Sequence, residues 1–201
     1  MKGLKVGLTG SIACGKSSVL RLFKKRGWLT MSADDIVRRQ FLFDKELLQS
    51  LKDYFGKRIF KRDLSVDRDA LSKIVFKDDN ALVFLEKKLH PRVRKTWQDF
   101  LKKNEKKFCL VEIPLLFEKK LENFFDFTVT VSCSESKQAI RLRQTSMDVK
   151  MVSQRKKKQV SQFEKRNLAD YVISNQGSRL FLDLQVELLH HNLVSNISKY
   201  E

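Results

Sequence analysis

The sequence predicts an α/β protein, a mostly parallel β-sheet flanked by helices, within a single domain of 201 residues. Short apolar runs typical of buried strands alternate with longer segments in which Leu, Phe and Val recur at three- and four-residue spacing, as on one face of a helix. A glycine-containing phosphate-binding motif follows the first apolar run. With only 7 Gly and 2 Pro, the chain shows no linker, and it has no internal repeat.

The elements are expected in alternating order along the chain. Strands are predicted at 4–9, 28–32, 108–113, 126–132 and 170–174. Helices are predicted at 16–26, 34–52, 67–76, 78–103, 135–145, 149–163 and 178–198. The interval between the second and third strands is longer than one crossover helix requires. We therefore expect a helical substrate-binding insert at about 35–105.

The motif at residues 10–17, GSIACGKS, fits G-x-x-x-x-G-K-[ST] in a strand–loop–helix context. Gly10 and Gly15 allow the backbone to turn so that N–H groups converge on phosphate, Lys16 reaches the β- and γ-phosphates, and the Ser17 hydroxyl reaches Mg²⁺. The alternative is a glycine-containing turn that matches by chance, and the context argues against it. The sequence thus predicts a P-loop NTPase-type fold that binds a nucleoside triphosphate through Ala13, Cys14, Gly15, Lys16, Ser17 and Ser18.

The net charge of +17, from 41 Lys and Arg against 24 Asp and Glu, indicates an anionic partner. Nucleic acid, a membrane surface and polyanionic small molecules all remain compatible with it. The richest basic runs, 102–107 and 155–158, lack interleaved aromatic residues, since most Phe lie in core-like segments. We therefore expect no nucleic-acid partner.

The three cysteines, Cys14, Cys109 and Cys133, form no C-x-x-C pair and no zinc-ligand spacing. This usage is typical of a reducing cytosol. The chain leads directly into its first strand without a signal-peptide pattern, and no segment has 18 uninterrupted apolar residues. We expect a cytoplasmic protein with no membrane partner.

Two carboxylates follow predicted strands at the edge where ligands bind in open α/β sheets. Asp34 can accept a proton from an attacking hydroxyl; alternatively, Ser32 or Asp34 caps the following helix and Asp35 stabilises its positive end. Glu112 ends an apolar strand, as does the acid that supports Mg²⁺ in phosphate-loop enzymes. Alternatively, Glu112 is a buried acid paired with a nearby Arg or Lys.

Five blocks in order resemble the dephospho-CoA kinase family from residue 5 to about 178. They are 7–10 with the phosphate loop, 32–34 (SAD), 89–91 (LHP), 112–118 (EIPLLFE) and 169–175 (ADYVISN). The resemblance implies a nucleoside- and small-molecule-kinase-like fold with a helical lid at about 140–165. It also implies ATP-dependent phosphorylation of the ribose 3′-hydroxyl of dephospho-CoA to give coenzyme A, the last step of its biosynthesis, with Mg²⁺ as cofactor.

The same resemblance implies roles for single residues. Asp34 matches the second Asp of the family's Asp-Ala-Asp motif and resembles the general base, whereas Ser32 replaces the first Asp. His90 and Arg94 lie where the family binds the acceptor. Asn175, with Gly177, lies near where the family holds the adenine.

The expected lid begins near residues 138–142 (QAIRL), and Arg141 is its principal candidate to contact phosphate, beside Arg143 and Arg155. With Asp34 and Lys16, Arg141 completes the expected catalytic set. The family's Arg-Asp-Gly turn is missing, and residues 144–147 (QTSM) replace it. Within the loop, Ser11, Ala13 and Cys14 stand where the family usually has Gly, Gly and Ser.

Two other classes of protein keep the phosphate loop. One is another small-molecule kinase, such as a nucleoside or shikimate kinase, which the LHP and PLLFE blocks disfavour. The other is a basic phosphate-loop protein that acts on nucleic acid, which the lack of an aromatic–basic surface motif disfavours.

Overall fold

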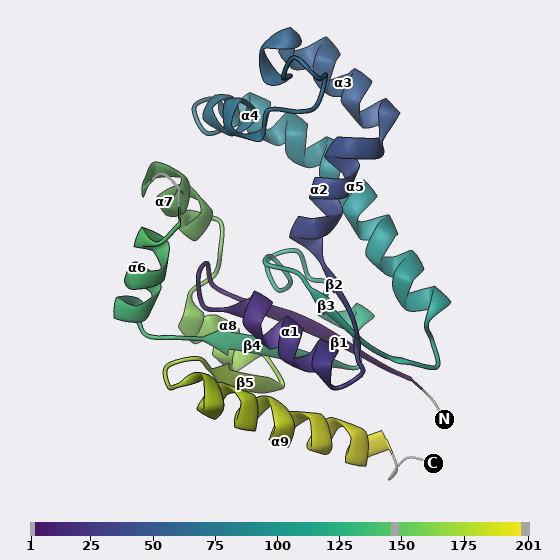
Figure 1. Ribbon diagram of the computed structural model, residues 1–201, viewed down its shortest axis with the longest axis vertical. Helices are drawn as coiled ribbons and strands as arrows, with labels where there is room; N and C mark the ends of the chain where they lie inside the picture. The colour runs from purple at the N-terminus through teal and green to yellow at the C-terminus, as the bar shows by residue number, and fades with distance from the viewer. Residues whose placement is uncertain (1–2, 146–148, 198–201) are drawn as a thin grey trace. The chain divides into compact units, whose positions relative to one another are not determined.

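The computed structural model describes residues 3–145 and 149–197 (Figure 1). The chain divides into two compact units. The first comprises Met1–Met31 and Leu101–Glu201, and the second comprises Ser32–Phe100. Among the described residues, no helix has both the length and the apolar character to cross a bilayer.

Five strands form the sheet, in the order β2-β3-β1-β4-β5. β1 pairs in parallel with β3 and with β4, and β4 pairs in parallel with β5. Each predicted strand is confirmed to within one residue at either end. The strands are β1 (Leu4–Gly10), β2 (Leu29–Ser32), β3 (Phe108–Glu112), β4 (Phe127–Ser132) and β5 (Tyr171–Ser174). Because β1 is the central strand, the loop that follows it leaves from the middle of the sheet's carboxyl edge.

The first unit has its main core on one face of this sheet. Val6 and Leu8 of β1 belong to the same fully buried cluster as side chains of α1 (Lys16–Lys25) and α9 (Arg179–Ile197). On the opposite face, a Cβ at Gly7 would come within 2.6 Å of the Leu116 side chain and 2.9 Å of Phe125. The sheet therefore packs closely on both faces, as a central parallel strand requires.

Three further helices of the first unit follow β4: α6 (Glu135–Arg143), α7 (Val149–Lys157) and α8 (Gln162–Leu168). The single helix predicted at 149–163 is wrong. Ser161 caps α8 through a capping box, in which its hydroxyl accepts from the Glu164 N–H and the Glu164 carboxylate accepts from the Ser161 N–H. The S-x-x-E spacing in the sequence is the signal for this new start.

The second unit is helical and has its own core, which includes Leu47, Leu51 and Ile59. Its helices are α2 (Ala33–Phe43), α3 (Lys45–Phe55), α4 (Arg68–Val75) and α5 (Asp79–Lys103), and α5 continues to Lys103 in the first unit. One-turn 3-10 helices lie at Lys57–Ile59 here and at Glu122–Phe124 in the first unit.

The single helix predicted at 34–52 is also wrong, because Asp44 divides it. Asp44 has extended backbone angles, and its carboxylate accepts from the Leu47 N–H at 2.9 Å, which starts α3. The same carboxylate pairs with Arg92 of α5 at 2.9 Å. One side chain thus ends a helix, begins the next and ties both to α5.

Replacement of Asp44 by Ala removes both the cap and the ion pair, and we expect a loss of about 1–2 kcal/mol in the free energy of unfolding. Asp44→Asn keeps a capping oxygen and loses only the ion pair, so it should lose less than half as much. Asp53→Ala, which removes an exposed acceptor on α3, is the control and should change little. Urea unfolding followed by circular dichroism measures all three, and equal losses for Ala and Asn would contradict the capping role.

Candidate active site

The loop between β1 and α1 has the backbone of a phosphate-binding turn. Gly10, Ala13 and Gly15 have positive φ angles of 143°, 58° and 97°. A Cβ at Gly10 would lie 2.4 Å from the Val131 carbonyl oxygen, and one at Gly15 would lie 2.0 Å from Asn175 Nδ2. Both glycines are therefore required by space as well as by conformation.

Side chains satisfy every carbonyl oxygen from residue 10 to residue 14. The Cys14 N–H also donates within the loop, to the Ser11 carbonyl at 3.3 Å. The N–H groups at the start of α1, which lack intrahelical partners, are the ones that can bind an anion. The side-chain donors to the loop carbonyls are Lys16 to the carbonyls of Gly10 and Ser11, Gln138 to Ile12, Arg141 to Ala13 and Cys14, and Asn175 to Cys14.

Lys16 is nearly buried, and its ammonium lies 3.0 Å and 3.1 Å from two of these carbonyl oxygens. Neutral carbonyls are weaker partners for an ammonium than phosphate oxygens. Ser17 is exposed in the first turn of α1, and the Ser18 N–H begins that helix by donating to the Gly15 carbonyl at 3.0 Å. The predicted nucleotide-binding residues of the loop are thus contiguous and lie at a helix N-terminus.

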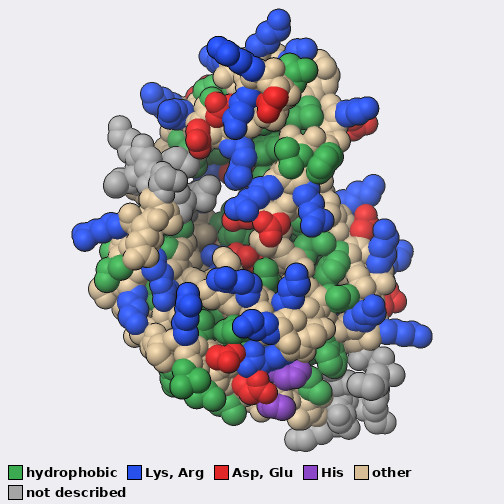
Figure 2. Space-filling model, viewed as in Figure 1, with side chains coloured by type: hydrophobic (Ala, Val, Ile, Leu, Met, Phe, Trp, Pro, Cys, Tyr) green, Lys and Arg blue, Asp and Glu red, His purple; other side chains and the backbone are tan. Residues whose placement is uncertain are grey.

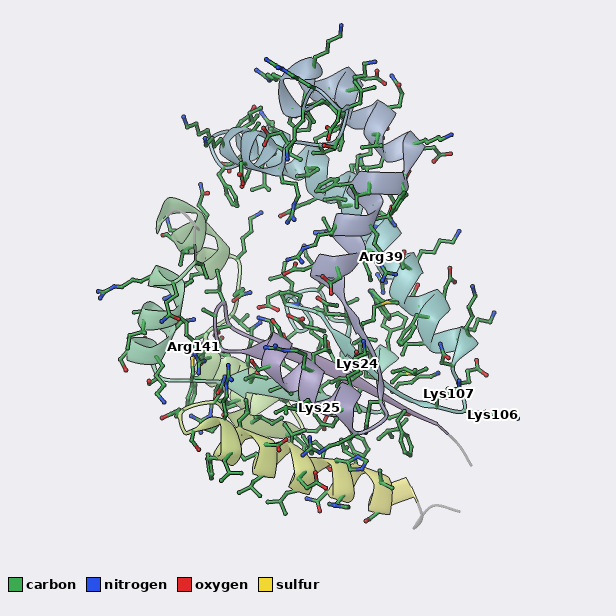
Figure 3. All side chains as sticks on the ribbon, viewed as in Figure 1. Lys24, Lys25, Arg39, Lys106, Lys107 and Arg141 are labelled. Carbon is green, nitrogen blue, oxygen red and sulfur yellow. The ribbon has the colours of Figure 1, made fainter. Side chains whose placement is uncertain are left out.

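Arg141 and Asn175, predicted from separate segments, meet at the loop. Arg141 of α6 lies beside the turn between β1 and α1 (Figure 3). It donates to the carbonyl oxygens of Ala13 (3.3 Å), Cys14 (3.1 Å) and Asn175 (3.0 Å). Asn175, buried directly after β5, donates its side-chain amide to the Cys14 carbonyl at 2.8 Å.

Ala13 stands where the family usually has Gly, at a position whose backbone conformation favours glycine. Its φ of 58° lies in the left-handed region, where a residue with a Cβ carries about 1–2 kcal/mol of strain. The Arg141 contact to the Ala13 carbonyl helps to hold this conformation.

Cys14, a second departure from the family pattern and fully buried, pairs with Cys133, which directly follows β4. The Cys133 thiol donates to Cys14 Sγ at 3.3 Å, and the Cys14 thiol donates to Gln162 Oε1 at 3.4 Å. Burial, reinforced by the hydrogen bond from Cys133, raises the pKa of the Cys14 thiol to about 12. Both residues are free cysteines, and Cys14 stays a neutral thiol near pH 7.

The other site residues predicted in the first unit are Glu112, Arg143 and Arg155. Glu112 is buried at the carboxyl end of β3, in register with Leu8 of β1. Arg143 is exposed near the end of α6, and Arg155 lies on α7. Of the substituted turn at 144–147, Ser146 and Met147 lie outside the described residues.

Sequence reasoning missed three polar residues that contact this region: Gln138, Gln162 and Lys165. All three are helical, and two of them, Gln138 and Lys165, are buried. Gln138 donates to the Ile12 carbonyl at 2.6 Å across 126 residues of sequence. No local pattern signals such a contact, because Gln, Lys and Arg are ordinary residues on exposed helix faces.

The remaining candidates, Asp34, His90 and Arg94, belong to the second unit. Ser32 occupies the N-cap position of α2, but its side chain makes no capping hydrogen bond. Asp34 lies exposed in the first turn, so it is not the cap, and the neighbouring Asp35 pairs with Arg38 at 3.4 Å. His90 and Arg94 are exposed on α5 one helical turn apart, hence on one face.

The positive charge is broadly distributed. Figure 2 shows Lys and Arg side chains spread over the visible face rather than gathered in one block. Among the described residues, no group of three or more His, Cys, Asp or Glu is arranged to hold a metal ion. An oxygen site completed by phosphate is the kind of metal site that such a loop offers.

Comparison with known proteins identifies close similarity to one family. A family model described as dephospho-CoA kinase matches residues 4–180. The dephospho-CoA kinase of Protochlamydia amoebophila is 35% identical over 199 residues, which cover 96% of this chain and 98% of that protein. That of Methylococcus capsulatus is 34% identical over 188 residues, covering 93% and 95%.

Solved structures agree with the sequence comparison. A Thermus thermophilus crystal structure has 30% identity and a TM-score of 0.78, covering 96% of this chain and 99% of its own. The Campylobacter jejuni dephospho-CoA kinase has 26% identity and a TM-score of 0.66, covering 94% and 96%. Shikimate kinase from Acinetobacter baumannii, at 12% identity and a TM-score of 0.52, covers 96% of this chain and 94% of its own and shares the fold alone.

Gly15→Ala tests the loop geometry against a matched glycine. Gly15 and Gly27 both have positive φ, at 97° and 83°, but a Cβ at Gly27 would meet nothing within 4 Å. Gly27→Ala should lose about 1 kcal/mol of stability from backbone strain, and Gly15→Ala should lose at least as much, because its Cβ also meets Asn175. We expect only Gly15→Ala to weaken ATP binding, by about 10-fold or more, because its Cβ displaces the Asn175 amide.

Isothermal titration with ATP and thermal melts measure the two effects separately. Equal ATP affinity in Gly15→Ala and Gly27→Ala would contradict the assignment of the loop as the nucleotide site.

Proposed function

The chain belongs to the dephospho-CoA kinase family, and on that premise we propose that it transfers the γ-phosphoryl group of ATP to the ribose 3′-hydroxyl of dephospho-CoA, giving coenzyme A. One observation supports this proposal beyond the similarity itself. Every carbonyl oxygen of residues 10–14 is bound by a side chain, so the backbone of the loop is organised before a nucleotide arrives.

In the proposed reaction, the loop N–H groups and Lys16 bind the β- and γ-phosphates of ATP. Phosphoryl transfer proceeds through a loose transition state in which charge spreads over the equatorial oxygens of the transferred group. The Lys16 ammonium leaves its two carbonyl partners and follows this charge. The gain is electrostatic, because a phosphate oxygen is a better acceptor for an ammonium than a carbonyl oxygen.

Arg141 is proposed to hold the loop and to contact phosphate at the same time. Its contacts with the carbonyl oxygens of Ala13, Cys14 and Asn175 use three of its five N–H groups. Within the described part of the chain, the other two N–H groups are left to donate to phosphate. A planar guanidinium that is already oriented loses little freedom when phosphate binds. Asn175 is proposed to lie beside the adenine while its side chain fixes the Cys14 carbonyl.

The second unit is proposed as the acceptor-binding insert of a single kinase domain, with the segment at about 140–165 as its lid. His90 and Arg94 present a basic face of α5 suited to the anionic groups of dephospho-CoA. Asp34 is proposed as the general base that takes the 3′-hydroxyl proton and orients the oxygen for attack. Its exposed carboxylate fits a group that meets a solvent-borne substrate.

Mg²⁺ is proposed as the cofactor, because the residues present fit a hard cation. The Ser17 hydroxyl would hold it, and Glu112 offers a carboxylate at the end of β3. When bound, Mg²⁺ neutralises part of the phosphate charge. Lys16 and the loop N–H groups orient the same phosphates independently of it.

We further propose a cytoplasmic location, with ATP and dephospho-CoA as partners and with neither nucleic acid nor a membrane among them. The three free, buried cysteines suit a reducing compartment. Two polyanionic substrates give the net charge of +17 a role in attracting ligands.

An acceptor panel tests the proposed activity. Purified protein with Mg-ATP should phosphorylate dephospho-CoA, and mass spectrometry with fragmentation should place the phosphate on the ribose 3′-oxygen. Nucleosides, shikimate and oligonucleotides should give no product. Turnover of one of these acceptors with none of dephospho-CoA would overturn the proposal.

Asp34→Asn tests the proposed base, with Asp35→Asn as its control. Both residues lie exposed in the first turn of α2, so both changes remove the same favourable interaction with the helix dipole. We expect turnover to fall by roughly 10²- to 10⁴-fold in Asp34→Asn alone, since only that change removes the carboxylate proposed to accept the 3′-hydroxyl proton. ATP affinity should persist in both variants.

Steady-state kinetics with dephospho-CoA measures the difference. If Asp34→Asn turns over as fast as Asp35→Asn, the carboxylate of Asp34 is not the base.

A further inference from the structure

A buried ion pair lies beneath the phosphate loop, within the first unit. Lys165 of α8 is 1% exposed, and its ammonium lies 2.9 Å from Glu118 Oε1. The ammonium also donates to the Pro114 carbonyl oxygen at 2.8 Å and to Thr9 Oγ1 at 3.4 Å. Its three protons thus have three acceptors, which is the condition under which a lysine can be fully buried.

Two of these acceptors belong to the base of the loop. Thr9 is the residue before Gly10, and its hydroxyl donates to the Pro114 carbonyl at 3.2 Å. Pro114 lies two residues beyond the end of β3. Lys165 therefore joins the carboxyl ends of the two adjacent strands β1 and β3 at the point where the loop begins.

The pair also reaches the segment that returns from α7. Glu118 Oε1 accepts from the Val160 N–H at 3.0 Å, immediately before the cap of α8. Gln162 is the first residue of α8, and its Oε1 accepts from the Cys14 thiol at 3.4 Å and from the Cys133 N–H at 3.1 Å. The start of α8 is thus fixed both to the strand ends below the loop and to the loop itself.

The charges of the pair also act on Lys16 of the phosphate loop. Desolvation by burial lowers the pKa of Lys165, the Glu118 carboxylate opposes that shift, and the charge of Lys16 lowers the pKa further. Lys165 contacts the Thr9 hydroxyl and Lys16 contacts the carbonyl of the next residue, Gly10, so the two ammonium groups bind adjacent residues. Glu118 is nine-tenths buried and stands next to Lys165 rather than in solvent.

We propose that Lys165 and Glu118 form a positioning pair, which holds the phosphate loop in its nucleotide-binding conformation and sets the charge balance next to Lys16. The proposal rests on the proposed kinase activity and assigns neither residue a contact with substrate. It predicts that loss of the Lys165 charge and loss of the Glu118 charge change ATP affinity in opposite directions. Without Lys165, a buried carboxylate repels the phosphates, whereas without the Glu118 charge, Lys165 remains to attract them.

A purely structural ion pair makes a different prediction. Breaking it from either side leaves one buried, unpaired group and destabilises the protein in both cases. ATP affinity would then fall in both variants or in neither. The sign of the affinity change, rather than the loss of stability, separates the two roles.

Four variants test the pair: Lys165→Met, Glu118→Gln, the double variant, and Arg166→Met as control. Arg166 is the exposed neighbour on α8, so its replacement removes the same charge from the same helix. In Glu118→Gln, Oε1 keeps its role as acceptor, and the amide nitrogen takes the position of Oε2, which accepts from no group among the described residues.

ATP affinity is measured by titration with N-methylanthraniloyl-ATP, below the melting temperature of each variant. We expect Lys165→Met to bind about 10-fold more weakly, Glu118→Gln to bind as tightly as wild type or more tightly, and Arg166→Met to match wild type. Equal losses in Lys165→Met and Glu118→Gln, or none in Lys165→Met, would overturn the proposal.

If Lys165→Met does not fold, the double variant still tests the proposal, because the double variant leaves no unpaired charge buried in the protein. Its ATP affinity should fall less than that of Lys165→Met, because no buried carboxylate is left to repel the phosphates, while its kcat should fall about 10-fold through lost positioning. A wild-type kcat in the double variant would overturn the proposal. The nucleotide titrations need no acceptor, so they stand even if wild-type protein fails to phosphorylate dephospho-CoA, which would count against the proposed function alone.

Discussion

The site depends on one constraint: the backbone between β1 and α1 must turn so that its carbonyl oxygens meet side-chain donors of the protein. Positive φ angles at Gly10, Ala13 and Gly15 make this turn. Four side chains, from α1, α6 and the residue after β5, then bind the carbonyls of residues 10–14. Since unpaired buried carbonyls are unfavourable, these contacts select this conformation of the loop.

This arrangement connects stability with function in the first unit. Arg141 and Asn175 are placed by α6 and by the end of β5, and both are also satisfied by the loop they hold. Groups fixed before ATP binds need little reorganisation when charge develops during transfer. Ala13 and Cys14, which depart from the family pattern, are accommodated by the same contacts: the Ala13 carbonyl by Arg141 and the Cys14 thiol by Cys133 and Gln162.

Much of the fold could be predicted from the sequence, because strands are short apolar runs and the phosphate loop has fixed spacing. The helix divisions at Asp44 and Ser161 were missed, although both are capping residues, because helical periodicity continues through them. Arg141 and Asn175 were found only through family resemblance. Gln138 and Lys165 could not be found, because they act across 126 and 156 residues of sequence and their residue types are common on exposed helices.

The central claim is that amides of the loop and of the first turn of α1 bind the phosphates, while Gln138, Arg141 and Asn175 keep their contacts with the carbonyls of residues 12–14. Titration of ¹⁵N-labelled protein with Mg-ATP, followed by NMR, tests it most directly. The backbone amides from Ala13 to Ser17 should shift strongly as ATP saturates, and the side-chain amides of Gln138 and Asn175 should move little. Saturation by ATP with unshifted loop amides would contradict the account.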